Sequence, residues 1–178
     1  GRDYREVAEE CQQRYDGLVD LVLVGNEAEQ QQHDGLDESF EQTDDDWNDL
    51  IFAFCDYWPD VKKAGPGASS GHPWRLNGFR LDKLDYVSAH PVGKIPSDRL
   101  PQLLPTGWGF GPLSDWIDGY AALGKPLVVD EVVAPESELG AWGQAGYLVA
   151  MLKQLNDPRV ALSMVYCWSD RMSPEKRM

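Results

Sequence analysis

Residues 125–133, with the sequence Lys-Pro-Leu-Val-Val-Asp-Glu-Val-Val, decide the fold of this chain. The run is apolar and rich in β-branched residues, and so is the run Leu-Val-Asp-Leu-Val-Leu-Val at residues 18–24. Nearly continuous apolar runs of this length are typical of strands that are buried on both faces, as in the parallel sheets of α/β proteins. The two runs therefore predict a parallel sheet that is covered by helices.

The rest of the chain alternates between helical and strand patterns. Apolar residues recur at spacings of three and four where helices are expected, and Gly or Pro follows several of these stretches. Predicted helices cover residues 3–15, 44–58, 113–123 and 138–155, and predicted strands cover residues 18–24, 60–66, 84–90, 125–133 and 160–168. Alternation of strand and helix along a chain indicates an α/β architecture.

The spacing of the strand ends favours a barrel over an open sheet. The notable ends fall at Glu27, His90, Glu131 and Trp168, and four repeats of about 35 residues separate the first from the last. A (β/α)8 barrel spends roughly 31 residues on each unit and carries its chemistry at the C-terminal ends of its strands. We therefore expect an α/β fold of the (β/α)8 TIM-barrel type, present as a partial barrel of about five βα units in a single domain over residues 1–178.

Composition and missing motifs exclude several classes of function. The 178 residues include 30 acidic and 16 basic side chains, for a formal net charge of −14, so neither a nucleic acid nor an anionic membrane surface is an expected partner. No run approaches the roughly 20 apolar residues of a membrane helix. Glycine-rich nucleotide motifs and the serine-hydrolase elbow are missing. The three histidines are scattered, so neither a metal nor another cofactor is expected.

The acidic balance and the cysteines leave two questions open. Asp accounts for 19 of the 30 acidic residues, which fits either a halophilic source or an ordinary acidic surface. Cys11, Cys55 and Cys167 lack the close pairing of a disulfide framework or a zinc site, and they leave the compartment undecided.

Two carboxylates stand at the ends of apolar strands. Glu27 follows the run at 18–24, and Glu131 lies within the run at 125–133. A glutamate is costly to bury there unless it has a task, and two that share a cavity would have pKa values pushed apart. Glycoside hydrolysis needs this arrangement, with one protonated carboxyl and one ionised carboxylate about 5–5.5 Å apart in a retaining enzyme. The alternative is that each Glu is a polar strand end paired with a surface cation.

Several segments resemble the clan A glycoside hydrolases, which are retaining enzymes with a (β/α)8 barrel. The Gly-Asn-Glu at residues 25–27 is similar to the end of their fourth strand, and the Lys-Pro-x-x-x-x-Glu at residues 125–131 is similar to their seventh. The Asp-Tyr-Val-Ser-Ala-His at residues 85–90 resembles the sixth, and residues 161–168 resemble the eighth. The resemblance spans nearly the whole chain, as strands four to eight.

The resemblance implies a role for each matching residue. Glu27 would be the general acid/base, and Glu131 would be the nucleophile that forms a glycosyl-enzyme ester. Asn26 would bind the sugar 2-hydroxyl. His90 would contact the sugar or orient a carboxylate, unless it is a structural histidine at a strand end. Trp168 would form an apolar platform under the sugar ring, unless it packs in the core.

Two features depart from the family pattern. The Tyr that many relatives carry close to the sixth-strand His is absent after His90, and Tyr86 precedes that residue by four positions. Asp130 stands beside Glu131, and regular alternation along the strand would point Asp130 away from the barrel lumen.

The length of the chain raises a question of partners. Five βα units fall about 70 residues short of a barrel of roughly 250, and both edges of such a sheet would need cover. We expect the missing part to lie upstream of Gly1, because the chain lacks an initiator Met, or on another chain. The expected ligand is a carbohydrate. Two other interpretations stay open: a non-catalytic carbohydrate-binding or structural subunit on a hydrolase-derived scaffold, and an unrelated α/β enzyme that uses the same cavity.

Overall fold

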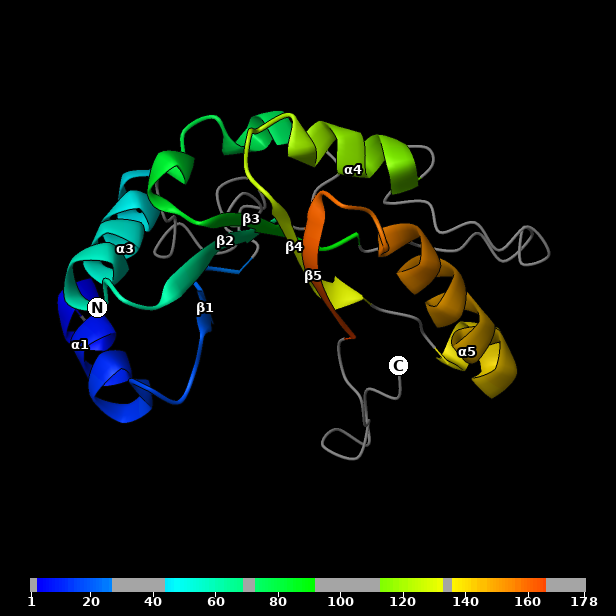
Figure 1. Ribbon diagram of the computed structural model, residues 1–178, viewed down its shortest axis with the longest axis horizontal. Coiled ribbons are helices and arrows are strands. Elements are labelled where there is room, and N and C mark those ends of the chain that lie inside the picture. Colours follow the sequence, from blue (N-terminus) through cyan, green and yellow to red (C-terminus); the bar gives the residue numbers. More distant parts are fainter. Residues whose placement is uncertain (1–2, 27–43, 69–72, 92–112, 133–135, 166–178) are drawn as a thin grey trace.

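A five-stranded parallel sheet, curled into a half-barrel, forms the centre of the computed structural model. The structure describes residues 3–26, 44–68, 73–91, 113–132 and 136–165. Its helices lie outside the arch of strands, and the opposite, concave face of the sheet is turned away from them (Figure 1). The elements in chain order are α1 Tyr4–Tyr15, β1 Leu21–Leu23, α3 Asp44–Tyr57, β2 Lys62–Ala68, η2 Pro73–Leu76, η3 Leu81–Lys83, β3 Tyr86–Ala89, α4 Leu113–Ala121, β4 Leu127–Val132, α5 Glu136–Leu155 and β5 Val160–Val165.

The strands lie side by side in the order in which they follow along the chain. The order is β1-β2-β3-β4-β5, and each neighbouring pair is parallel. Consecutive parallel strands joined by helices form the repeating unit of a barrel wall. The predicted α/β class and partial barrel thus agree with the observed curled sheet, and the helices end within a few residues of the predicted ranges.

The second strand begins and ends two residues later than its sequence indicates. The predicted weak strand at residues 60–66 is observed as β2, Lys62–Ala68, and every residue of it except Lys62 is buried. It contains no β-branched residue in Lys-Lys-Ala-Gly-Pro-Gly-Ala. A Cβ atom at Gly65 would lie 2.5 Å from the carbonyl oxygen of Val24. The close approach of β1 therefore requires glycine at this position.

The first strand is shorter and more exposed than predicted. The sequence predicts a strand over residues 18–24 that is buried on both faces, but β1 covers Leu21–Leu23 alone. Leu18 is 76% exposed, and Val19 and Leu23 are also exposed. The expectation is wrong because β1 lies at the edge of the sheet, where one side of the strand has no neighbour among the described residues.

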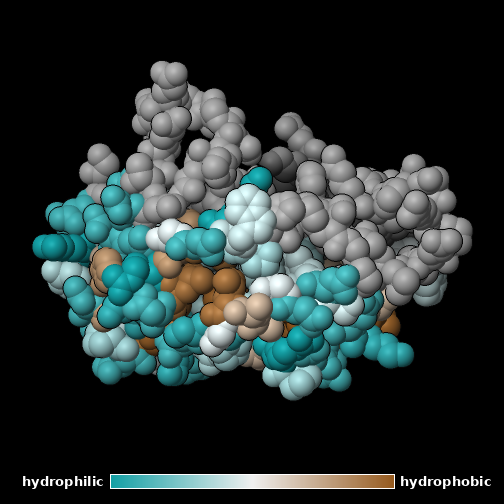
Figure 2. Space-filling model, turned by 90° about the horizontal axis from the view of Figure 1, so that it is seen from above, coloured by the Kyte–Doolittle hydropathy of each residue, from teal (hydrophilic) through white to brown (hydrophobic). Residues whose placement is uncertain are grey.

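The main core lies between the sheet and its outer helices. Leu127, Val129 and Val132 of β4 pack there with residues of α4 and α5 such as Tyr120 and Tyr147. A second buried cluster joins α1 to α3 around Ala8, Ile51 and Trp58. The described surface seen from above is largely hydrophilic, with apolar side chains exposed in one area (Figure 2). No described helix meets the length and apolarity that a membrane span needs.

Candidate active site

The carboxyl ends of the strands bring three of the predicted site residues to one edge of the sheet. Asn26 follows β1 and is exposed, His90 follows β3 and is buried, and Glu131 lies near the end of β4 and is half-buried. All the strands are parallel, so these ends share the edge where barrel enzymes carry their active sites. Glu27 and Trp168 lie outside the described residues, as do most residues of the connections at this edge.

A buried pair of a histidine and an aspartate occupies this edge of the sheet. His90 Nδ1 lies 3.1 Å from Asp130 Oδ1, and the two side chains are 0% and 4% exposed. The two atoms lie within hydrogen-bond distance, and the imidazole can donate its Nδ1–H to the carboxylate when that nitrogen carries the proton. Burying two such groups is tolerated because each satisfies the other.

The Asp130 carboxylate lies on the concave side of the sheet. A Cβ atom at Gly67 would lie 3.1 Å from Asp130 Oδ2. Gly67 is in β2 and Asp130 is in β4, with β3 between them. Side chains of alternate strands meet in this way across the inside of a curled sheet, as they do in the layers of a barrel interior. The expectation that Asp130 points away from the lumen is therefore wrong.

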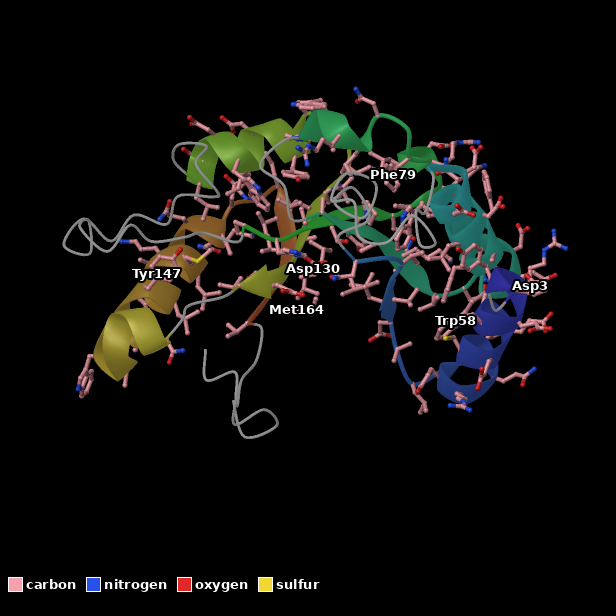
Figure 3. All side chains as sticks on the ribbon, turned by 180° about the vertical axis from the view of Figure 1, so that it is seen from behind. Asp3, Trp58, Phe79, Asp130, Tyr147 and Met164 are labelled. Atoms are coloured by element: carbon pink, nitrogen blue, oxygen red, sulfur yellow. The ribbon has the colours of Figure 1, made fainter. Side chains whose placement is uncertain are left out.

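An irregularity in β4 explains why simple alternation fails. Val129 pairs with Ser163 and Val132 pairs with Val165, so Asp130 and Glu131 together oppose Met164 of β5. Two residues opposite one define a β-bulge, a feature that often re-aims side chains next to active sites. Figure 3 shows Asp130 and Met164 on the side of the sheet away from α4.

Gly67 brings the end of β1 close to this bulge. Its φ of 66° lies in the left-handed region, and a Cβ atom there would lie 3.1 Å both from the Cα atom of Asn26 and from Asp130 Oδ2. Asn26 Cα and Asp130 Oδ2 are therefore less than twice this distance apart. The Gly67 N–H donates to Ser88 Oγ at 2.8 Å, which ties β2 to β3 at the same level. Asn26, which follows β1, and Asp130, in the bulge of β4, thus lie close together on either side of Gly67.

The sequence alone assigns no role in the site to Asp130, Gly67 or Ser88. The signal for Asp130 is present, because two successive carboxylates in an apolar strand break the alternation of faces and indicate a bulge. No local signal marks Ser88 or Gly67, since their importance depends on contacts between strands. Among the described residues, no group of three or more His, Cys, Asp and Glu side chains could hold a metal ion.

The half-barrel has clear counterparts among solved structures, although the sequence matches no protein-family model and no curated protein. The fold is similar to part of a glucosidase from Croceicoccus marinus, with a TM-score of 0.56 and 16% identity over 91% of this chain. It is also similar to part of a monomeric beta-xylosidase from Caulobacter crescentus CB15, with a TM-score of 0.54 and 18% identity over 92% of this chain. The chain spans 37% of the length of each of these two chains.

Proposed function

We propose that this chain supplies strands four to eight of a (β/α)8 barrel in a retaining glycoside hydrolase of the clan A type. The observation that carries the proposal is the close approach of Asn26, at the end of β1, to Asp130 in the bulge of β4 across Gly67. This is the edge of a parallel barrel where catalytic groups gather. The similarity of the fold to parts of a glucosidase and a beta-xylosidase supports the same class of reaction.

The bulge supports Glu131 as the nucleophile. Val129 and Val132 both pack in the core on the helix side. In a regular strand, residues three positions apart would point to opposite faces, so the bulge between them interrupts the alternation of side chains. A bulge of this kind re-aims the side chains that it contains, and the proposal puts Glu131 beside Asp130 on the concave face. Glu131 is also the less buried of the two, as a group that must reach a substrate needs to be.

The chemistry follows from two carboxyl groups in different protonation states. The Glu131 carboxylate attacks the anomeric carbon while Glu27 gives its proton to the departing oxygen. The glycosyl ester formed on Glu131 is then hydrolysed by a water molecule whose proton returns to Glu27. In this mechanism Asn26 binds the sugar 2-hydroxyl, His90 contacts the sugar or orients a carboxylate, and Trp168 lies under the sugar ring.

The exposed apolar side chains support a complete barrel formed with further βα units. Of the nine large hydrophobic side chains that are exposed among the described residues, all but Trp74 belong to the two ends of the arc. They are Tyr15, Leu18, Val19 and Leu23 around α1 and β1, and Trp142, Val149, Leu152 and Leu162 on α5 and β5. Three further strands with their helices would cover both ends and bring the sheet to eight strands. They belong either to the same protein or to a partner chain.

Covalent trapping tests the proposed function. Once the chain is assembled with the βα units that complete the barrel, we expect 2-deoxy-2-fluoro glycosides of glucose or xylose with a good leaving group to add mass to it, at Glu131 in a peptide digest. Glu131→Gln should abolish this labelling. Glu27→Ala should slow aryl glycoside hydrolysis by about 10²–10⁴-fold, the usual contribution of a general acid. Glu9→Gln, at an exposed position of α1, is the matched control and should behave as the wild type.

A non-catalytic carbohydrate-binding subunit is the second candidate. It is favoured by one observation, the share of 37% that the chain covers of its structural neighbours. A folded chain that binds oligosaccharides but takes up no label with any fluoro-sugar would support this function and contradict the catalytic one.

A further inference from the structure

We propose that Asp130 is a positioning residue, which fixes the proton of His90 on Nδ1 and holds the bulge segment that carries Glu131. The inference rests on the proposed function for the role of Glu131, and on the geometry of the His90–Asp130 pair for everything else. Asp130 belongs to β4 and His90 follows β3, so the hydrogen bond of 3.1 Å between them joins two neighbouring strands at their carboxyl ends.

The His90–Asp130 pair lies outside the apolar core that holds the sheet to its helices. The core between sheet and helices is built from apolar side chains, among them Val87, Ala89, Val129 and Val132 of the same two strands. Ser88 of β3 and His90, directly after β3, alternate with Val87 and Ala89, and Asp130 follows Val129 on β4. The polar side chains therefore gather on the concave face at the carboxyl edge, where a substrate would bind.

The proposed hydrogen bond to Asp130 leaves only one ring nitrogen of His90 for other partners. With Nδ1–H donated to a carboxylate, any hydrogen bond from His90 to a sugar or to another carboxylate is made through Nε2. The choice of tautomer and ring orientation by a buried carboxylate is a known means of making an imidazole functional. The backbone of Glu131 is restricted too, because Asp130 is its covalent neighbour within the bulge and is anchored by a buried bond.

Nuclear magnetic resonance of the histidine nitrogens tests the tautomer without any assay of activity. In the full 178-residue chain labelled with 15N-histidine, we expect His90 to carry its proton on Nδ1, either as the neutral tautomer or as the imidazolium. His90→Gln assigns the signal among the three histidines. In Asp130→Asn the amide can donate to Nδ1, so the proton should move to Nε2. A neutral Nε2–H tautomer in the wild type would overturn the proposal.

The rate of labelling tests the effect on Glu131. We expect Asp130→Asn to slow the labelling of Glu131 on the order of 10²-fold, because the reacting carboxylate is displaced. The change should appear in the rate constant of the labelling step and not in the binding constant of the fluoro-sugar. Asp130→Glu retains a carboxylate and should keep the Nδ1 proton and recover part of the rate. Asp85→Asn is the matched control, because Asp85 accepts hydrogen bonds from Lys62 and Lys63, away from the candidate site, and its labelling rate should equal that of the wild type.

The two arms separate failure of this inference from failure of the proposed function. Label on Asp130 instead of Glu131, or an unchanged rate in Asp130→Asn, would overturn the positioning role while retaining a glycosidase. Absence of label in the wild-type chain assembled with its completing βα units would end the proposed function and with it the effect on Glu131. The histidine spectra would then still decide whether Asp130 sets the proton of His90.

Discussion

Gly67 is the residue on which the geometry of the candidate site depends most directly. It adopts a φ of 66°, and a side chain there would meet the Gly25 carbonyl oxygen at 3.0 Å and both Asn26 and Asp130 at 3.1 Å. Two of these neighbours are backbone atoms, which cannot rotate aside. The absence of a side chain at Gly67 is thus what allows the ends of β1 and β4 to approach each other.

We predict that Gly67→Ala lowers the free energy of unfolding by about 1–3 kcal/mol. The backbone strain of an alanine in the left-handed region adds to the steric clash of its Cβ atom with the neighbouring atoms. Gly124→Ala is the control, since Gly124 has a similar φ of 80° but a Cβ atom there would have nothing within 4 Å. Urea denaturation of both variants separates the two contributions. Equal losses of unfolding free energy would show that the packing around Gly67 has no energetic effect.

At the scale of the element, the bulge in β4 is the feature that changes the interpretation of the sequence. Residues 125–133 are correctly predicted as a strand, and β4 is observed at Leu127–Val132. The face of each side chain is not predictable, because one extra residue in β4 relative to β5 shifts the pattern. The extra residue is defined by the hydrogen bonds of the partner strand, about 30 residues further along.

The turn before β5 gives a prediction on pH. The Arg159 side chain and its backbone N–H both donate to Asp157 and lower the pKa of that carboxyl to about 2. Because the folded pKa lies below the unfolded one, this interaction stabilises the fold above about pH 4 and is lost as the pH falls through about 2. In Arg159→Gln, a carboxyl titration by NMR should give a higher pKa for Asp157. An unchanged pKa would contradict the assignment.

At the scale of the whole molecule, the two ends of the arc differ from its middle. The strands β2, β3 and β4 are largely buried, whereas β1 and β5 contain exposed apolar residues such as Leu23 and Leu162. An edge strand with unpaired backbone groups is a template for pairing with another chain. The exposed apolar residues of β1 and β5 are consistent with the proposal that further strands pair at both ends.

Hydrogen exchange followed by mass spectrometry tests this difference. In the isolated chain we expect the amides of β1 and β5 to exchange well before those of β3 and β4, because edge strands open locally at lower cost. Addition of the completing βα units, on the same or another chain, should then protect β1 and β5. Equal protection of all five strands in the isolated chain at low concentration would contradict the assignment of β1 and β5 as open edges.

Local patterns in the sequence are sufficient to predict the α/β class, the order of helices and strands, and the grouping of Asn26, His90 and Glu131 at one edge of the sheet. These features depend on periodicity and on the rule that parallel strands end at a common edge. The folded chain was needed to establish that β1 is an exposed edge, that Asp130 lies on the concave face and pairs with His90, and that Gly67 must lack a side chain. Each of these depends on hydrogen-bond register and close approach between strands far apart in the chain, and local patterns do not encode such contacts.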